Sequence, residues 1–348
     1  MTIISVPAVR QYEVHIGSGL LARCGSAVSP GSVCAIVTDD TVDALYRETV
    51  EKSLRDAGSR SVTFVFPHGE AGKSGETYLR LLEFLAQHHL TRSDAIFALG
   101  GGVPGDLAGF AAATYLRGIA LVQLPTTLLA AVDSSVGGKT GIDLRAGKNL
   151  AGAFYQPSAV LCDPDALDTL PEVQLRAGCA EVIKYAMLQD ADFFASLLQS
   201  GFAFEREAVI ARCVAMKRDF VLRDEFDRGC RQLLNFGHSV GHAIEALSGF
   251  TIFHGQAVAM GMAAITRASC AAGLCSAACV RALEDILARF ALPIRCPYSA
   301  EAVCAVMASD KKRRGNELTL VVPRAVGQCA LHTLPLDALT DFVKAGIL

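Results

Sequence analysis

The stretch Ala95-Ile96-Phe97-Ala98-Leu99-Gly100-Gly101-Gly102-Val103-Pro104-Gly105-Asp106 is an apolar run that leads directly into a glycine-rich turn. The run is typical of a buried strand, and the residues after it predict a helix over 105–114. Gly100, Gly102 and Gly105 satisfy the pattern G-x-G-x-x-G, which lets backbone N–H groups and a helix N-terminus approach a pyrophosphate. We therefore expect a nucleotide-binding turn here; a tight glycine turn without a ligand is the alternative.

Segments around this stretch alternate between short apolar runs and helical patterns. The runs predict strands at 33–38, 62–66, 95–99 and 119–124, and the segments between them predict helices at 42–57, 75–89 and 105–114. Strands and helices in alternation build a parallel sheet with helices on both faces. The fold class is therefore expected to be α/β, with a Rossmann-like, doubly wound parallel sheet in the N-terminal part.

The pattern changes after about residue 172. Long helical stretches follow at 172–200, 206–223, 236–247 and 256–272, and the next strand pattern runs from Leu318 to Val322. Pro164 and Pro171 flank the change. We expect an α/β domain over residues 1–171 and a mainly α-helical domain over residues 172–348.

Two details of the glycine turn differ from the standard dinucleotide fingerprint. The turn follows the third expected strand, and the next strand closes on Gln123-Leu124-Pro125 without an acidic residue. Asp39, at the end of the first strand, is the better candidate for binding a ribose.

Gly137-Gly138-Lys139-Thr140 looks like the end of a P-loop, but Asp133 stands where that motif requires glycine. ATP hydrolysis is therefore not supported, whereas Lys139 remains a candidate phosphate or hydroxyl contact.

The overall charge is close to balanced, with 32 Lys and Arg against 35 Asp and Glu and a formal net charge of -3. No basic field is available to hold a polyanion, so nucleic acid is not an expected partner.

Every apolar run is shorter than the ~20 residues that span a bilayer, and the opening segment lacks the features of a signal peptide. We therefore expect a cytoplasmic protein with no membrane partner.

Twelve cysteines are scattered along the chain, and none forms a Cys-x-x-Cys pair. The nearest approach to a group is Cys270, Cys275 and Cys279, in an alanine-rich stretch. A thiolate metal site is one interpretation. Reduced cysteines that act as small buried side chains in a cytosolic protein fit the pattern better.

Three of the eight histidines, His238, His242 and His254, fall within a short stretch. His238 and His242 are four residues apart and share one face of a helix, which suits a metal ligand beside a second functional imidazole. The residue after His238 is not glutamate, so this is not an H-E-x-x-H protease helix. A catalytic zinc typically has three protein ligands, and Glu181 is an attractive further ligand because it and Lys184 interrupt an apolar helix. A chance histidine pair and an ordinary Glu–Lys helix pair are the alternatives.

Segments along nearly the whole chain together resemble the 3-dehydroquinate synthases. The segments that carry this resemblance are Thr38-Asp39-Asp40, Gly69-Glu70-Ala71-Gly72-Lys73, Gly100 through Gly109, Pro125-Thr126-Thr127, Asp133 through Thr140, Gly147-Lys148-Asn149, Phe154-Tyr155-Gln156-Pro157, Ala180 through Tyr185, Leu234 through His238 and Asp310-Lys311-Lys312. They follow one another in the same order as in the family. The resemblance implies an N-terminal NAD domain, a helical C-terminal domain that holds zinc or cobalt, and a homodimer.

The resemblance also implies roles for individual residues. It makes Glu181, His238 and His254 the metal ligands, and His242 the imidazole available for proton handling. The other residues that match catalytic contacts with substrate and phosphate are Asp133, Lys139, Asn149 and Lys184. Further substrate contacts match Lys217, Arg231, Asn235, one of Lys311 and Lys312, and Arg117 of the partner subunit. NAD contacts match Asp39, Glu70, Lys73, Gly101, Gly102, Gly105, Asp106, Thr126, Thr127 and Lys148.

The implied reaction converts a sugar phosphate, 3-deoxy-D-arabino-heptulosonate 7-phosphate, to 3-dehydroquinate and phosphate in the shikimate pathway. Its steps are a transient oxidation by NAD, elimination of phosphate, reduction by the same cofactor, ring opening and an intramolecular aldol reaction. The metal polarises the reacting oxygen. The lysines and arginine are expected to hold the two anionic ends of the substrate in a cationic pocket between the domains.

Three other interpretations stay open. The nearest is another sugar phosphate cyclase, one that makes an aminodehydroquinate or a valiolone, although Lys217, Arg231 and Asn235 as a set suit a carboxylated substrate. The second is a metal-dependent alcohol dehydrogenase, a class of related fold. This interpretation predicts net formation of NADH and gives the many cations no role. The third is a non-catalytic binding protein that kept the fold. Pro104, Asp143 and Gln256 depart from the residues usual in the family.

Overall fold

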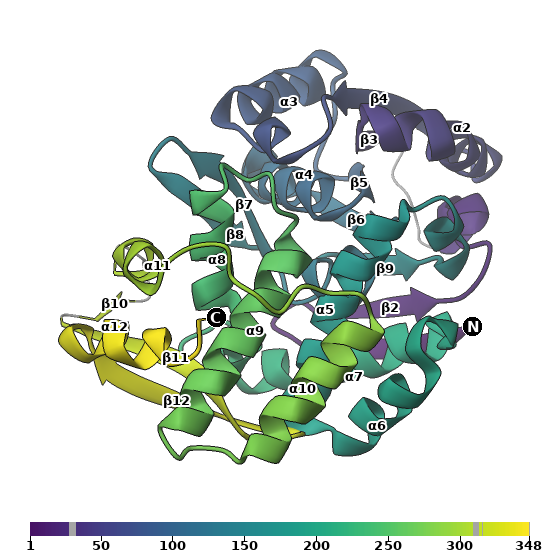
Figure 1. Ribbon diagram of the computed structural model, residues 1–348. Coiled ribbons are helices and arrows are strands. Elements are labelled where there is room, and N and C mark those ends of the chain that lie inside the picture. The colour runs from purple at the N-terminus through teal and green to yellow at the C-terminus, as the bar shows by residue number, and fades with distance from the viewer. Residues whose placement is uncertain (28–32, 309–312, 315, 348) are drawn as a thin grey trace. The chain divides into compact units, whose positions relative to one another are not determined.

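The computed structural model describes residues 1–27, 33–308, 313–314 and 316–347. The chain divides into two compact units (Figure 1). We call Met1–Leu170 together with Arg206–Phe226 the first unit, and Pro171–Glu205 together with Asp227–Leu348 the second unit.

The first unit is built on a seven-stranded sheet in the order β1-β2-β9-β6-β5-β3-β4. Its strands are β1 Thr2–Val6, β2 Tyr12–Ile16, β3 Val33–Asp39, β4 Arg60–Phe66, β5 Ala95–Gly100, β6 Ala120–Pro125 and β9 Ala159–Cys162. All neighbouring strands pair in parallel except β1 and β2, which are antiparallel. The four strands expected from the sequence are confirmed, and they occupy the β6-β5-β3-β4 half of the sheet.

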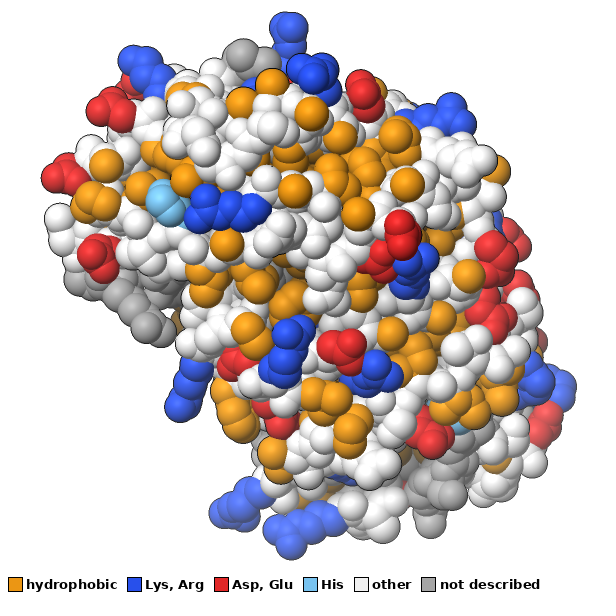
Figure 2. Space-filling model, turned by 90° about the horizontal axis from the view of Figure 1, so that it is seen from below, with side chains coloured by type: hydrophobic (Ala, Val, Ile, Leu, Met, Phe, Trp, Pro, Cys, Tyr) orange, Lys and Arg blue, Asp and Glu red, His pale blue; other side chains and the backbone are white. Residues whose placement is uncertain are grey.

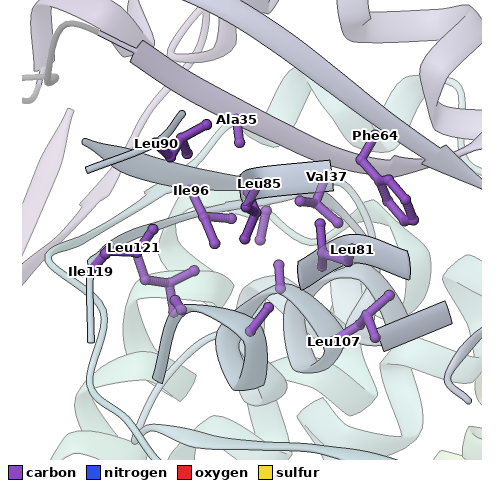
Figure 3. Close-up of a cluster of buried hydrophobic side chains, with 14 of the residues drawn as sticks. Ala35, Val37, Phe64, Leu81, Leu85, Leu90, Ile96, Leu107, Ile119 and Leu121 are labelled. Atoms are coloured by element: carbon purple, nitrogen blue, oxygen red, sulfur yellow. The ribbon is translucent and has the colours of Figure 1, made fainter. Parts of the chain in front are cut away.

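Helices pack on both faces of this sheet. The helices and helical turns of the first unit are η1 Leu21–Arg23, α1 Cys24–Ala27, α2 Asp40–Asp56, η2 Glu70–Gly72, α3 Gly75–Gln87, α4 Gly102–Thr114, η3 Tyr115–Arg117, η4 Ala130–Ser134, η5 Pro164–Asp168 and α7 Arg206–Arg223. Alternate residues of β3 point to opposite faces. Val37 belongs to the core with Leu81 and Leu107 of α3 and α4 (Figure 3), whereas Ile36 belongs to the core with Leu54 of α2. The doubly wound architecture is therefore confirmed.

Helix α7 corrects the expected domain division. The sequence pattern placed residues 206–223 in the helical domain, yet α7 belongs to the first unit. Arg206 donates to the Pro164 carbonyl oxygen and to Asp168, and Glu207 accepts a hydrogen bond from the Thr2 hydroxyl. The buried face of α7 packs against β1, β2 and η4. A single domain boundary at residue 171 is therefore not sufficient, because the chain returns to the first unit at Arg206.

The second unit is mainly helical. Its helices are α5 Glu172–Gln189, α6 Ala191–Ser200, η6 Gly201–Ala203, η7 Cys230–Asn235, α8 His238–Leu247, α9 His254–Ala271, α10 Ala277–Arg289, α11 Ala300–Met307 and α12 Leu336–Lys344. The helix expected over 172–200 is broken at Asp190, because its side chain accepts from the Phe193 N–H and starts a new helix. The expected strand at 318–322 lies inside β11.

Two small sheets complete the fold. β10 Arg313–Arg314, β11 Glu317–Ala325 and β12 Gln328–Pro335 form an antiparallel sheet in the second unit. β7 Lys139–Leu144 and β8 Gly147–Phe154 form a hairpin in the first unit.

Acidic and basic side chains are interspersed on the face of the molecule shown in Figure 2, as the nearly balanced charge leads one to expect. Among the described residues, no helix is both long and apolar enough to cross a membrane.

Candidate functional site

Three side chains that were expected to hold a metal come together in the second unit. Glu181 lies in the middle of α5, and His238 and His254 are the first residues of α8 and α9. Close packing of these helices depends on glycine. A Cβ at Gly255 would lie 1.9 Å from the Ala177 carbonyl oxygen. A side chain at that position would therefore push α9 away from α5.

The geometry of this group fits a divalent cation. The Nε2 atoms of His238 and His254 lie 3.5 and 3.3 Å from Glu181 Oε1, and one ligand atom from each residue lies within 4.8 Å of the others. Glu181 is 1% exposed, so its carboxylate needs positively charged or donor groups around it. Two imidazoles and a carboxylate are a common donor set for catalytic zinc. We call Glu181, His238 and His254 the metal group.

The proton positions on the two imidazoles also suit a cation. His238 Nδ1 lies 3.1 Å from the Phe236 carbonyl oxygen, and His254 Nδ1 lies 3.1 Å from Glu245 Oε2. Both partners are acceptors, so each Nδ1 carries a proton, and each Nε2 is the nitrogen that faces the metal group, where a cation would replace a proton. Burial lowers the pKa of His254, but hydrogen bonds and negative charge from Glu181 and Glu245 outweigh it and raise that pKa to about 10.

Lys184 and His242 lie beside the metal group. Lys184 Nζ is 2.5 Å from Glu181 Oε2, and both side chains are buried. The His242 ring centroid lies 5.4 Å from that of His238 and 5.9 Å from that of His254. The described part of the second unit therefore places a fixed cation and a further imidazole next to the carboxylate.

Glu245 also lies beside the metal group, and it was not predicted from the sequence. A detectable signal existed, because His238, His242 and Glu245 are spaced i, i+4 and i+7 and so share one face of α8. Arg231 and Asn235, two predicted substrate contacts, lie in η7, and Arg231 is 1% exposed.

The glycine turn of the first unit forms where β5 ends. Gly101 is the N-cap of α4, no described side chain caps that end, and Pro104 lies in the first turn. Proline is tolerated there because first-turn N–H groups have no partner within the helix. A Cβ at Gly105 would lie 2.9 Å from Gln123 Oε1, so this glycine allows α4 to pack closely on β6. The N–H groups of the turn remain candidates for binding a pyrophosphate.

Other predicted NAD contacts lie near this turn. The Thr126 N–H donates to the Gly100 carbonyl oxygen, and a Cβ at Gly101 would lie 3.1 Å from Thr127 Cγ2. Asp39 ends β3, which pairs with β5 in parallel, so both carboxyl ends lie at the same edge of the sheet. Ligands of doubly wound sheets bind at that edge.

A second polar network ties the segment after η2 and helix α4 to the β7–β8 hairpin. Lys73 Nζ lies 2.5 Å from both Asp106 Oδ2 and Asn149 Oδ1. Burial lowers the pKa of Lys73, but the charge and hydrogen bond of Asp106 outweigh it and raise the pKa. Asn149 has a φ of 54°, and its N–H donates to Asp143 Oδ1 at 2.8 Å. Lys148 Nζ lies 3.4 Å from Glu70 Oε1.

The remaining predicted residues belong neither to the metal group nor to the Lys73 network. Lys217 of α7 forms an ion pair with Asp133 of η4, and its Nζ also donates to the Asp133 carbonyl oxygen at 2.6 Å. Lys139 begins β7. Arg117 is exposed and has a φ of 65°. Lys311 and Lys312 lie outside the described residues.

Asp39 offers a test that separates a helix cap from a ligand contact. Its Oδ1 accepts hydrogen bonds from the N–H groups of Thr41 and Val42, and burial raises the pKa of its carboxyl. Asp39→Ala is expected to lower the free energy of unfolding by about 0.5–2 kcal/mol, whereas Asp39→Asn retains a cap. If the carboxylate binds a ribose, both variants bind NAD more weakly. Urea unfolding and NAD calorimetry measure the two effects, and unchanged NAD affinity in both variants would contradict the ribose contact.

Comparison with known proteins places the chain in one family. Residues 63–177 match the family model described as 3-dehydroquinate synthase N-terminal, and residues 178–313 match the one described as 3-dehydroquinate synthase C-terminal. A curated 3-dehydroquinate synthase of Streptococcus suis (strain 05ZYH33) is 43% identical over 344 residues, covering 96% of this chain and 97% of that protein.

Two solved structures of related cyclases share the fold. A 2-deoxy-scyllo-inosose synthase complexed with carbaglucose-6-phosphate, NAD+ and Co2+ has a TM-score of 0.91 at 25% identity, covering 99% of this chain and 100% of its own. A 2-epi-5-epi-valiolone synthase from Streptomyces hygroscopicus subsp. jinggangensis 5008, with NAD+ and Zn2+ bound, has a TM-score of 0.88 at 28% identity, covering 96% and 95%. With both family models matched along the chain, this protein belongs to the 3-dehydroquinate synthase family.

Proposed function

We propose that the protein converts 3-deoxy-D-arabino-heptulosonate 7-phosphate to 3-dehydroquinate and phosphate, as a carbon–oxygen lyase of the shikimate pathway that leads to aromatic amino acids. The observation that carries the proposal is the buried metal group, found in a chain 43% identical to a curated 3-dehydroquinate synthase over nearly its whole length. Zinc or cobalt in the second unit and NAD in the first are the proposed cofactors. The solved relatives hold the same kinds of cofactor.

Each cofactor has a defined task in this proposal. When bound, NAD would supply reversible hydride transfer at a ring carbinol, and the divalent cation would polarise the oxygen of that carbon. Glu181, His238 and His254 would hold the cation. The turn at Gly101, Gly102 and Gly105, together with Asp39, Glu70, Lys73, Asp106, Thr126, Thr127 and Lys148, would hold NAD.

The second unit supplies buried charge and a proton-handling group. Lys184 and Arg231 are each 1% exposed, so their charges act in an environment that excludes water. Fixed cations in such surroundings bind phosphate and carboxylate groups strongly. Asn235 is assigned to the same substrate contacts. His242 lies beside the metal group and is the residue expected to exchange protons with the substrate.

The first unit supplies further substrate contacts. Lys217 is 5% exposed and paired with Asp133, which fixes the position of its ammonium group. Asn149 is held by Lys73 and Asp143, and Lys139 begins the same hairpin. The assignments of Lys311 and Lys312 to substrate binding stay predictions.

We also propose that the protein works as a homodimer in the cytoplasm. The support is the exposed Arg117, which sits in a turn where Leu116 and Arg117 both have positive φ. Positive φ values at non-glycine residues are strained and gather at functional sites. The family resemblance assigns this residue to the active site of the neighbouring subunit.

A turnover assay tests the proposed activity. Purified protein with NAD, zinc and the heptulosonate phosphate is expected to release phosphate and dehydroquinate in equal amounts. Because the hydride returns to the substrate, the absorbance of NADH should show no net rise. Phosphate release and product are measured by coupled colorimetry and chromatography.

Two other outcomes would each point to a different enzyme. Turnover of a sedoheptulose phosphate or an amino analogue, without turnover of the heptulosonate, would assign the chain to another cyclase. Net accumulation of NADH would indicate a dehydrogenase.

A further inference from the structure

Glu245 holds His254 from the side opposite to the metal group. It lies in the last turns of α8 and is 3% exposed. Its Oε2 is 3.1 Å from His254 Nδ1, while His254 Nε2 lies 3.3 Å from Glu181 Oε1. One imidazole is therefore fixed between two buried carboxylates, each at a different ring nitrogen.

This arrangement decides which nitrogen can bind a cation. A ring nitrogen ligates a metal only when it carries no proton, and a carboxylate can only accept a hydrogen bond from the nitrogen that does. Glu245 therefore keeps a proton on Nδ1 and leaves the Nε2 lone pair directed toward Glu181 and His238. His238 shows the same pattern, with the Phe236 carbonyl oxygen at its Nδ1.

We propose that Glu245 is a positioning residue of the metal centre, which orients His254 and makes its Nε2 a stronger donor. The proposal rests on the metal site proposed above and adds a residue that binds neither metal nor substrate. Carboxylates in this position raise the basicity of the ligating imidazole, and replacing them typically costs about 10–100-fold in metal affinity.

A competing arrangement uses the same residues as a second cation site. His242, Glu245 and His254 also offer ligand atoms within 4.8 Å of one another. The two groups share His254, so a cation in each would require this imidazole to lose both ring protons and bridge them. A neutral imidazole serves one cation, which favours a single site with Glu245 behind it. Metal stoichiometry distinguishes the two arrangements.

The experiment measures zinc binding to purified, metal-stripped protein by competition with a chromogenic chelator, in the absence of substrate. Wild type is expected to bind one zinc per chain. Glu245→Gln keeps an acceptor for Nδ1–H but removes the charge, so we expect a loss of affinity of about 10-fold. Glu245→Ala removes the acceptor as well, so we expect a loss nearer 100-fold. Stoichiometry should stay at one in both variants.

Glu284→Gln is the matched control. Glu284 is also a carboxylate of the second unit and pairs with Arg267 of α9 at 2.6 Å. Arg267 lies about 20 Å along that helix from His254, at 1.5 Å per residue. The control removes a paired carboxylate far from the metal group and is expected to leave zinc affinity unchanged.

A spectroscopic measurement separates positioning from a general loss of structure. In Co2+-loaded wild type, the exchangeable Nδ1–H proton of His254 should give a paramagnetically shifted NMR signal. Glu245→Ala should lose this signal through faster exchange with water, whereas Glu245→Gln should keep it. If the alanine variant does not fold, the glutamine variant still reports the loss of affinity.

Three results are decisive. Wild-type affinity in both Glu245 variants would overturn the positioning role, and a fall from two zinc ions to one would make Glu245 a ligand instead. Wild type that binds no zinc at all would contradict the proposed metal site rather than the role of Glu245 within it.

Discussion

Replacing His238 with alanine is expected to remove the metal and to abolish turnover. His238 supplies one of three protein donors around a buried carboxylate, with its Nε2 3.5 Å from Glu181 Oε1. Loss of a ligand should exceed the loss of affinity of about 100-fold that marks the upper end for supporting residues. Chelator competition measures the zinc affinity, and phosphate release measures turnover.

His242→Ala is the informative control, because His242 lies four residues along the same helix face but outside the metal group. If His242 handles protons, this variant should keep zinc and lose turnover by about 10²–10⁴-fold. The two histidines thus separate metal binding from proton transfer. Wild-type zinc affinity in His238→Ala would contradict the assigned ligand, and zinc loss in His242→Ala would show that the ligand set was misassigned.

Local sequence patterns predicted those strands whose apolar residues match their burial in the sheet. The runs at 33–38 and 95–99 are apolar on both faces because their strands are central in the sheet. β2 also carried a signal, since Tyr12, Val14 and Ile16 alternate with more exposed residues, and it was overlooked. β8 carried almost none, because Gly147–Phe154 is rich in glycine and alanine and exposes several of its residues.

Tertiary contacts determined features of the fold that these local patterns did not predict. The helix at Arg206–Arg223 was predicted correctly, but its membership of the first unit follows from contacts with β1, β2 and η4 that lie far from it in the sequence. The break at Asp190 was missed because the residues on both sides favour helix, although an aspartate ahead of a helical run is a usual N-cap.

The sequence pointed to this region because histidines are few and His238 and His242 share one helix face, whereas the choice of His238 and His254 as ligands came from the family resemblance. Glu181 required chemical reasoning, since a carboxylate in an apolar helix needs a partner. Glu245 was missed because its partner His254 lies on the next helix, and only the structure places Oε2 against Nδ1.

Lys184→Met is expected to destabilise the metal-free protein strongly and the zinc-bound protein far less. Lys184 Nζ lies 2.5 Å from Glu181 Oε2, and these side chains are 1% and 2% exposed. Removing one partner of a buried ion pair costs about 3–5 kcal/mol, because the other charge loses its compensation. A divalent cation at the metal group supplies positive charge to the same carboxylate.

The two effects are linked through zinc affinity. If zinc relieves about 3 kcal/mol of the penalty, the variant must bind zinc about 100-fold more tightly than wild type, at 1.4 kcal/mol for each tenfold change. Turnover should nevertheless fall, because Lys184 is assigned to the substrate. Urea unfolding with excess chelator and with excess zinc measures the stabilities.

The double variant Glu181→Gln/Lys184→Met is the control for this argument. It removes both charges, so its metal-free stability should recover toward that of wild type, while its zinc affinity should collapse with the lost ligand. An equal loss of stability in the single variant with and without zinc would show that zinc and Lys184 do not share Glu181. Unchanged metal-free stability would show that the ion pair contributes little to holding α5 in place. The opposite responses expected for Lys184→Met and Glu245→Gln, tighter zinc binding in one and weaker in the other, follow from the charge that each residue brings to the same centre.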